Sequence, residues 1–224
     1  MELFSTPWWS ALASIVLIDL VLAGDNAIVI ALAARRLPMP IQRRAILWGT
    51  LGAIVVRAAM TIGVVWLLTL PGLRLVGGLA LLWIAWKLVT DGDAPKPHEE
   101  PAAVTFWGAM QTIVVADALM GIDNVIGVAG AARESMTLVL IGLLVSVPIV
   151  VSGSAMVLKL VHRFPQIIVA GGAVLAWTAA QMIVAEPLLA PLFAAPGTLH
   201  DAARWSTYAL AIAGVLGLAW WQRR

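Results

Sequence analysis

Cysteine is absent from the 224 residues, which excludes disulfides, thiolate metal sites and cysteine nucleophiles. Charge is also scarce, because Asp, Glu, Lys and Arg make up 12% of the chain, whereas ordinary soluble domains contain about 25%. With 62% hydrophobic residues, the chain cannot bury its apolar surface in one soluble core of ordinary composition. The composition therefore predicts an all-α, polytopic integral membrane protein.

Two further absences narrow the class of protein. No basic run is interleaved with aromatic residues, so we expect no nucleic-acid partner. The usual basic start of a signal peptide is replaced by Glu2, and the first apolar segment is too long for a signal-peptide core. We therefore interpret this segment as a retained membrane span, with the lipid bilayer as the surrounding partner.

Stretches of about 20 apolar residues are needed to cross the hydrocarbon layer, and charge and proline divide the sequence into seven such stretches. The expected spans are 8–34, 44–69, 73–90, 106–132, 136–159, 166–186 and 204–221. Residues 91–105 form the long polar stretch, rich in proline and charge, and are interpreted as a linker. The predicted organisation is a three-helix unit (1–90), this linker, a second three-helix unit (106–187), and a loop with the seventh helix (188–224).

The two three-helix units are related by an internal repeat. Residues 9–35 and 107–133 share 12 identities in 27 positions at an offset of 98. The repeat continues more weakly, with Gly49 resembling Gly142 in the second spans and paired glycines at 77–78 and 171–172 in the third. Because three is odd, the second unit must enter the membrane from the opposite side. This predicts a 3+3 inverted repeat, which is typical of secondary transporters with a binding site near the midplane.

The distribution of Lys and Arg predicts the orientation of the chain in a cell inner (plasma) membrane. One face carries ten of these residues: Arg35, Arg36, Arg43, Arg44, Lys87, Lys96, Lys159, Arg163, Arg223 and Arg224. The other carries three, namely Arg74, Arg133 and Arg204. Positive charge is concentrated on cytoplasmic loops, so we expect the N-terminus outside and the C-terminus in the cytoplasm.

Carboxylates inside the spans are the strongest functional signal, because a charge at the bilayer centre costs about 3 kcal/mol on insertion scales. The repeated motif consists of Asp19, Asp25 and Asn26 in the first half and Asp117, Asp123 and Asn124 in the second. Positions seven apart share a helical face, so the first Asp and the Asn of each motif point the same way. Gly24 and Gly121 precede the second Asp of each motif, and we expect them to loosen the helices so that the carboxylates point into one cavity.

An oxygen-only set of this kind suits a hard or borderline divalent cation such as Mn²⁺, Mg²⁺ or Ca²⁺. Zinc would more often require His or Cys within a span. The alternative is that the aspartates are protonated or paired with cations and only join helices. The asparagines are either metal ligands or interhelical hydrogen-bonding groups.

Arg57 lies in the second span, and its counterpart in the second half is near Val150 and Val151. Two interpretations remain open: an internal counter-ion for the acidic cluster when no metal is bound, or a permanent structural ion pair with one of the same aspartates. Lys87 is expected to be a snorkelling anchor at a span end, Glu186 a solvated boundary residue, and the paired glycines positions of close helix packing.

The segments 19–30 and 117–126, together with an arginine in the second span, closely resemble the TerC family, in particular its small YjbE-type bacterial branch, over nearly the whole chain. The family consists of seven-helix membrane proteins within the lysine-exporter-like transporters, several of them linked to manganese export and tellurite resistance. The resemblance implies a manganese exporter with Asp19, Asp25, Asp117 and Asp123 at the acidic motif positions. The motif departs from many members in carrying Gly24 and Gly121 where they have Ser.

We therefore expect an exporter of a divalent cation, with Mn²⁺ as the favoured ion, that works by alternating access and exchanges the metal for protons. We expect neither an enzymatic activity nor a prosthetic group. A homo-oligomer is compatible with the sequence. Three alternatives differ in class: a membrane interaction protein that supports metal delivery or a stress response, an amino-acid exporter, and an intramembrane aspartyl protease. The protease is disfavoured, because Leu22-Ala-Gly-Asp25 departs from the Gly-x-Gly-Asp pattern and proteolysis does not require four acids.

Overall fold

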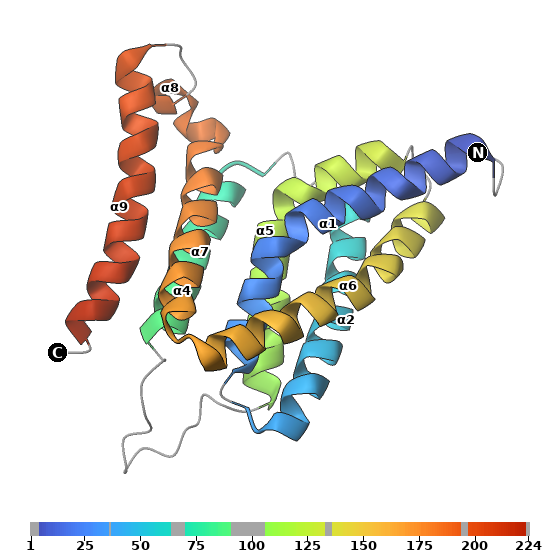
Figure 1. Cartoon of the computed structure of the whole chain (residues 1–224). Helices are drawn as coiled ribbons and strands as arrows, with labels where there is room; N and C mark the ends of the chain where they lie inside the picture. The colour runs from blue at the N-terminus through green and yellow to red at the C-terminus, as the bar shows by residue number, and fades with distance from the viewer. Residues whose placement is uncertain are drawn as a thin grey trace. The chain divides into compact units, whose positions relative to one another are not determined.

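The described part of the chain is helical in the computed structural model (Figure 1). The structure describes residues 5–35, 37–63, 70–90, 106–132, 136–193 and 197–222, without the side chains of 18–23, 123–132 and 136. The long helices are α1 (Thr6–Ala34), α2 (Met39–Ile62), α4 (Leu73–Thr90), α5 (Phe106–Ala132), α6 (Met136–Arg163), α7 (Gln166–Val184) and α9 (Thr198–Gln222). Two short elements, η1 (Pro187–Leu189) and α8 (Ala190–Phe193), lie between α7 and α9.

Five helices of the described chain are long and apolar enough to cross a membrane by length and composition. They comprise α2, α4, residues 137–163 of α6, α7 and α9. Shorter apolar stretches, Gly24–Ala34 and Phe106–Ile122, belong to α1 and α5. On α2 the side chains of Trp48, Val55 and Ile62 are 56%, 69% and 73% exposed, a surface that suits lipid rather than water. The prediction of a polytopic α-helical membrane protein is therefore confirmed.

The helix ends differ from the expected spans where local chemistry sets them. The second helix begins at Met39 rather than 44, because Pro40 occupies its first turn, where a missing backbone N–H costs nothing. The last begins at Thr198 rather than 204, directly after Gly197, whose φ of 149° is accessible mainly to glycine. Residues 64–69 and the linker 91–105 lie outside the described residues, so the linker remains a prediction.

The chain divides into two compact units, and the first consists of residues 1–67 and 104–159. Within it α5 packs against both α1 and α2 (Figure 1). Gly49 of α2 lies against Ile113 of α5, where an added Cβ would be 2.8 Å from the Ile Cδ1. Gly142 of α6 lies against Ile15 of α1, where an added Cβ would be 2.5 Å from the Ile Cγ2. These glycines therefore permit two close helix contacts that involve equivalent residues of the repeat.

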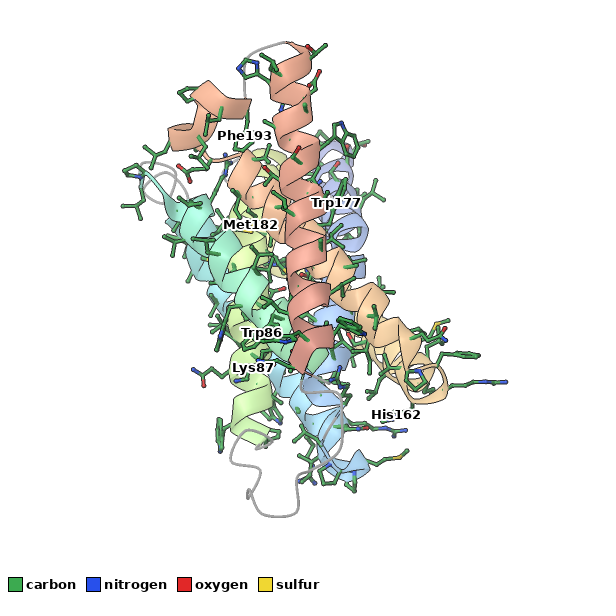
Figure 2. The ribbon with its side chains drawn as sticks, turned by 90° about the vertical axis from the view of Figure 1, so that its left-hand side faces the viewer. Trp86, Lys87, His162, Trp177, Met182 and Phe193 are labelled. Carbon is green, nitrogen blue, oxygen red and sulfur yellow. The ribbon has the colours of Figure 1, made fainter. Side chains whose placement is uncertain are left out.

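The second unit comprises residues 68–103 and 160–224 and contains α4, α7 and α9. Gly78 of α4 lies against Ile183 of α7, and Gly172 of α7 lies against Val89 of α4. Met182 lies in the same contact, 3.4 Å from the position of a Gly78 Cβ (Figure 2). Gly78 and Gly172 are 94 positions apart, as are Val89 and Ile183. The prediction that these glycines allow close helix packing is confirmed.

Aromatic side chains join α7 to α9 and occupy the end of α4. The rings of Trp177 and Tyr208 are 4.4 Å apart between centroids, and Trp177 lies beside α9 in Figure 2. The Nζ of Lys87 is 5.1 Å from the centroid of the Trp83 ring, a favourable cation–π geometry. Lys87 thus covers an aromatic surface at the end of its helix, and its role as an anchor stays a prediction.

The side chain of Glu186, which follows α7, forms hydrogen bonds with the start of α4. The prediction that Glu186 is a solvated boundary residue is wrong. Its side chain is 2% exposed. Its Oε1 accepts hydrogen bonds from the backbone N–H groups of Gly72 (3.0 Å) and Leu188 (3.3 Å). Its Oε2 accepts from the N–H groups of Arg74 (3.1 Å) and Leu75 (3.2 Å). The carboxylate therefore caps the first turn of α4, whose N–H groups lack partners within the helix.

Stability should depend on pH through Glu186. Burial opposes ionisation of this carboxyl, but the four backbone donors outweigh it and hold the pKa of Glu186 below its ordinary value of 4.5. A lowered folded pKa means that the stabilisation is present above about pH 4.5 and is lost as pH falls through the folded value. Glu186→Gln should cost about 1–2 kcal/mol at pH 7, as loss of a helix cap does, and should weaken the acid dependence. Thermal unfolding of both proteins in detergent between pH 3 and 8 measures this, and equal acid sensitivity would contradict it.

Candidate functional site

A small cavity lies in the first unit and is walled by four helices. Its volume is about 20 Å³, above the roughly 10–15 Å³ that one water molecule requires. The lining residues are Asn26 and Ile30 of α1, Thr50, Ala53, Ile54 and Arg57 of α2, Asp117 of α5, and Ser146, Val147 and Val150 of α6. The fold therefore brings predicted site residues of both halves, Asn26 and Asp117, to one cavity.

Arg57 and Asp117 form a buried ion pair across α2 and α5. The Nη2 of Arg57 donates a hydrogen bond to the Oδ1 of Asp117, and the side chains are 5% and 8% exposed. Such a pair is stable only while both partners are present, because either charge alone is costly in a buried site. The structure thus pairs Arg57 with Asp117, one of the motif aspartates. The contact is common to the counter-ion and structural interpretations.

The predicted loosening of helices at Gly24 and Gly121 is wrong. Helix α1 continues through Gly24 from Thr6 to Ala34, and α5 continues through Gly121 from Phe106 to Ala132. At Gly121 an added Cβ would be 3.8 Å from the Nε of Arg57. This glycine therefore lies beside the guanidinium, while its helical hydrogen bonding persists because glycine costs a helix only about 1 kcal/mol.

Two oxygen atoms on the cavity wall lack hydrogen-bond partners within the described chain. They are the Oδ1 of Asn26 and the Oγ1 of Thr50, and each residue is 4% exposed. Buried polar atoms are nearly always hydrogen-bonded in proteins. An amide oxygen and a hydroxyl without partners on one cavity wall are groups that a bound cation or water would satisfy.

Asp25 directly precedes the cavity residue Asn26 and is a second motif carboxylate whose side chain is described. It is half-buried, and its Oδ1 accepts a hydrogen bond of 3.0 Å from the backbone N–H of Asn26. It also interacts electrostatically with Asp117 and Arg57. Acids from the two sequence halves therefore share one electrostatic environment.

The remaining predicted ligands are Asp19, Asp123 and Asn124. The side chains of Asp19, Asp123 and Asn124 lie outside the described residues, although helices α1 and α5 cover their positions. Among the side chains that are described, no group of three His, Cys, Asp or Glu residues is close enough to hold a metal ion. The full six-residue metal site therefore stays a prediction.

Thr50 and Ser146 line the cavity, although neither is among the site residues predicted from the sequence. Thr50 lies seven positions before Arg57, hence on the same helical face, and this spacing was a usable signal. Ser146 was harder to recognise, because its equivalent in the first half is Ala53. Its Oγ donates a 2.8 Å hydrogen bond to the carbonyl of Leu143, which leaves oxygen lone pairs available.

The cavity wall repeats across the two halves. Ala53, Ile54 and Arg57 of α2 correspond to Ser146, Val147 and Val150 of α6 at the 93-residue separation that relates Gly49 to Gly142. All six line the cavity. Equivalent segments of α2 and α6 therefore contribute to the same site, with a cation on one side only.

Comparison with known proteins gives the family. Residues 4–224 match the model described as "Integral membrane protein TerC family". The chain is 40% identical over 190 residues to the uncharacterized membrane protein YjbE of Bacillus subtilis, covering 85% of this chain and 86% of that protein. It is 24% identical over 175 residues to the UPF0053 inner membrane protein YgdQ of Escherichia coli, covering 71% and 73% respectively.

A further relative is longer than this chain. The UPF0053 protein YegH of E. coli is 26% identical over 179 residues, which cover 72% of this chain and 34% of YegH. No solved structure matches the chain. The family match over almost the full length and the 40% identity to YjbE establish that this protein belongs to the TerC family of integral membrane proteins.

Proposed function

We propose that this protein exports a divalent metal ion, most consistent with Mn²⁺, by alternating access around the cavity between α1, α2, α5 and α6. The observation that carries the proposal is the meeting of Asn26 and Asp117, from the repeated motifs, in one buried cavity. Carboxylate, amide and hydroxyl oxygens are the ligands that Mn²⁺, Mg²⁺ and Ca²⁺ take. The substrate ion would bind Asp117, Asn26 and Asp25, completed by Asp19, Asp123 and Asn124.

An inverted repeat of three plus three helices is part of the proposal. The contacts Gly49–Ile113 and Gly142–Ile15 support it, because each joins a second-span glycine of one half to a first-span isoleucine of the other. In the third spans, Gly78 of the first half contacts Ile183 of the second, and Gly172 of the second half contacts Val89 of the first. Such reciprocal contacts are expected when two similar units are related by an approximate two-fold axis, and alternating access commonly moves one repeat against the other.

Access for the ion requires a change from the described conformation. The cavity has room for about one water, and Arg57 already occupies one oxygen of Asp117. Pro148 of α6 lies between the wall residues Val147 and Val150. It has no N–H for the carbonyl one turn earlier, so it interrupts the helical hydrogen bonding at this point. Bending of α6 at Pro148 would open the cavity.

The proposed location is the bacterial inner membrane, with the N-terminus outside and the C-terminus in the cytoplasm. The lysine and arginine distribution supports this orientation, and the relative YgdQ bears the name inner membrane protein. Efflux rather than uptake and exchange for protons are parts of the same proposal, and neither an enzymatic activity nor a prosthetic group is included. The Arg57–Asp117 pair argues against an aspartyl protease, which needs its aspartates available to activate water.

The proposal is tested by Mn²⁺ flux through the purified protein in lipid vesicles. Wild-type vesicles should release entrapped Mn²⁺ at a rate well above protein-free vesicles. Asp25→Asn should reduce the flux about tenfold or more, because it removes one negative charge from the cation's surroundings; a tenfold change corresponds to about 1.4 kcal/mol.

The matched control is Asp201→Asn, which makes the same chemical change at an exposed carboxylate on α9. It should leave the flux unchanged. No flux in the wild type, or undiminished flux in folded Asp25→Asn protein, would contradict the proposed site.

A further inference from the structure

We infer that Arg57 is a built-in cation that compensates Asp117 while the empty carrier reorients, so that the protein performs net metal efflux and is not restricted to metal-for-metal exchange. The inference rests on the proposed function and adds the step by which the unloaded protein returns. Its basis is the buried contact between the guanidinium of Arg57 and the carboxylate of Asp117.

The position of Arg57 makes it a competitor of the substrate. Its side chain lines the same cavity as Asn26, Thr50 and Asp117, and it contacts an oxygen that a bound ion would use. A cavity of about 20 Å³ cannot hold a hydrated divalent ion together with this contact, because that volume accommodates about one water. The metal and the guanidinium therefore occupy the carboxylate alternately.

The two halves differ in charge at this position. Arg57 on α2 corresponds to Val150 on α6, and both line the cavity. Among the described wall residues Arg57 is the cation. Only the first half of the repeat therefore places a positively charged side chain at this position of the cavity wall, where it can compensate an acidic site without metal.

Charge compensation determines which state can reorient. A buried carboxylate without a partner is costly in a low-dielectric environment. With Mn²⁺ bound, the metal compensates Asp117; without it, Arg57 does so, while the exchanged protons neutralise the other proposed carboxylate ligands. If Arg57 is made neutral, the loaded carrier can still reorient, but the empty carrier retains an uncompensated charge and its return slows.

The test separates net efflux from exchange in vesicles loaded with radiolabelled Mn²⁺. Net efflux is measured into metal-free buffer, and exchange is measured with unlabelled Mn²⁺ outside. Arg57→Gln should lower net efflux at least tenfold while exchange stays within about threefold of wild type. Arg57→Lys keeps the charge and should retain net efflux. Lys87→Gln, which neutralises a cation that does not line the cavity, should change neither flux.

The outcomes are distinguishable from failure of the proposed function. Wild-type vesicles that show neither flux would overturn the exporter proposal and this inference with it. Exchange in the wild type with equal net efflux from Arg57→Gln would overturn the inference alone, as would equal loss of both fluxes in folded Arg57→Gln protein. If Arg57→Gln does not fold, the two fluxes of the wild-type protein test the inference. Net efflux within about threefold of exchange supports the return of the empty carrier with Arg57 as the counter-ion, and net efflux far below exchange overturns it.

Discussion

Replacing Asp117 with alanine should lower the free energy of unfolding by about 3–5 kcal/mol, as expected when one partner of a buried ion pair is removed. The reason is that Arg57, 4% exposed, would keep its charge in a buried site without its carboxylate. Denaturant titration of the purified protein in detergent measures the change. Asp201→Ala breaks an exposed pair with Arg204 on α9 and should cost less than about 1 kcal/mol.

A double variant separates the structural from the transport role of this pair. Arg57→Met with Asp117→Leu removes both charges and should recover most of the lost stability, because well-packed apolar residues often replace buried ion pairs without loss. Mn²⁺ flux should nevertheless remain about a hundredfold below wild type, since the double variant lacks Asp117, a proposed ligand of the substrate. Recovery of both stability and flux would show that the pair is purely structural.

Replacing Gly142 with valine should destabilise the first unit by about 3 kcal/mol, at the upper end of the usual cost of overpacking. An added Cβ alone would lie 2.5 Å from the Cγ2 of Ile15, and Ile15 is fully buried. Valine adds two further carbons, so α1 and α6 must separate or both side chains must leave their preferred rotamers. Thermal unfolding in detergent measures the loss.

Gly214 on α9 provides the control, because an added Cβ there has no atom within 4 Å. Gly214→Ala should be neutral or stabilise by about 0.5–1 kcal/mol, the helix preference for alanine over glycine. Ile15→Ala combined with Gly142→Val should cost less than the sum of the two single changes, because Ile15→Ala creates the space that the valine fills. Strict additivity would contradict the proposed contact.

Helix positions followed from the sequence because hydrophobic length and charge interruptions determine membrane spans. The packing partners followed only in part. The repeat of Gly49 with Gly142 and of Ile15 with Ile113 was visible in the sequence, but their reciprocal contact required the structure. Glu186 shows the limit more clearly, since its backbone donors at Gly72, Arg74 and Leu75 are more than 100 positions away. No local sequence pattern predicts a helix cap from a residue so far away along the chain.

The acidic motif was recognisable because buried charge is costly and its duplication is hard to explain otherwise. Asn26, Asp117 and Arg57 accordingly meet at one cavity. The choice of Asp117 as the partner of Arg57 did not follow from the sequence, because four aspartates were available to a single arginine. Nor did the continuity of α1 through Gly24, since glycine permits a break in a helix without requiring one.

Anomalous scattering from crystals of the purified protein soaked in Mn²⁺ tests the central claim most directly. The account predicts a peak between α1 and α5, about 2.0–2.6 Å from oxygens of both acidic motifs, as hard-cation coordination requires, with the guanidinium of Arg57 displaced from Asp117. A cavity without a peak at saturating Mn²⁺, or an ion bound only to polar connections outside the helices, would contradict it.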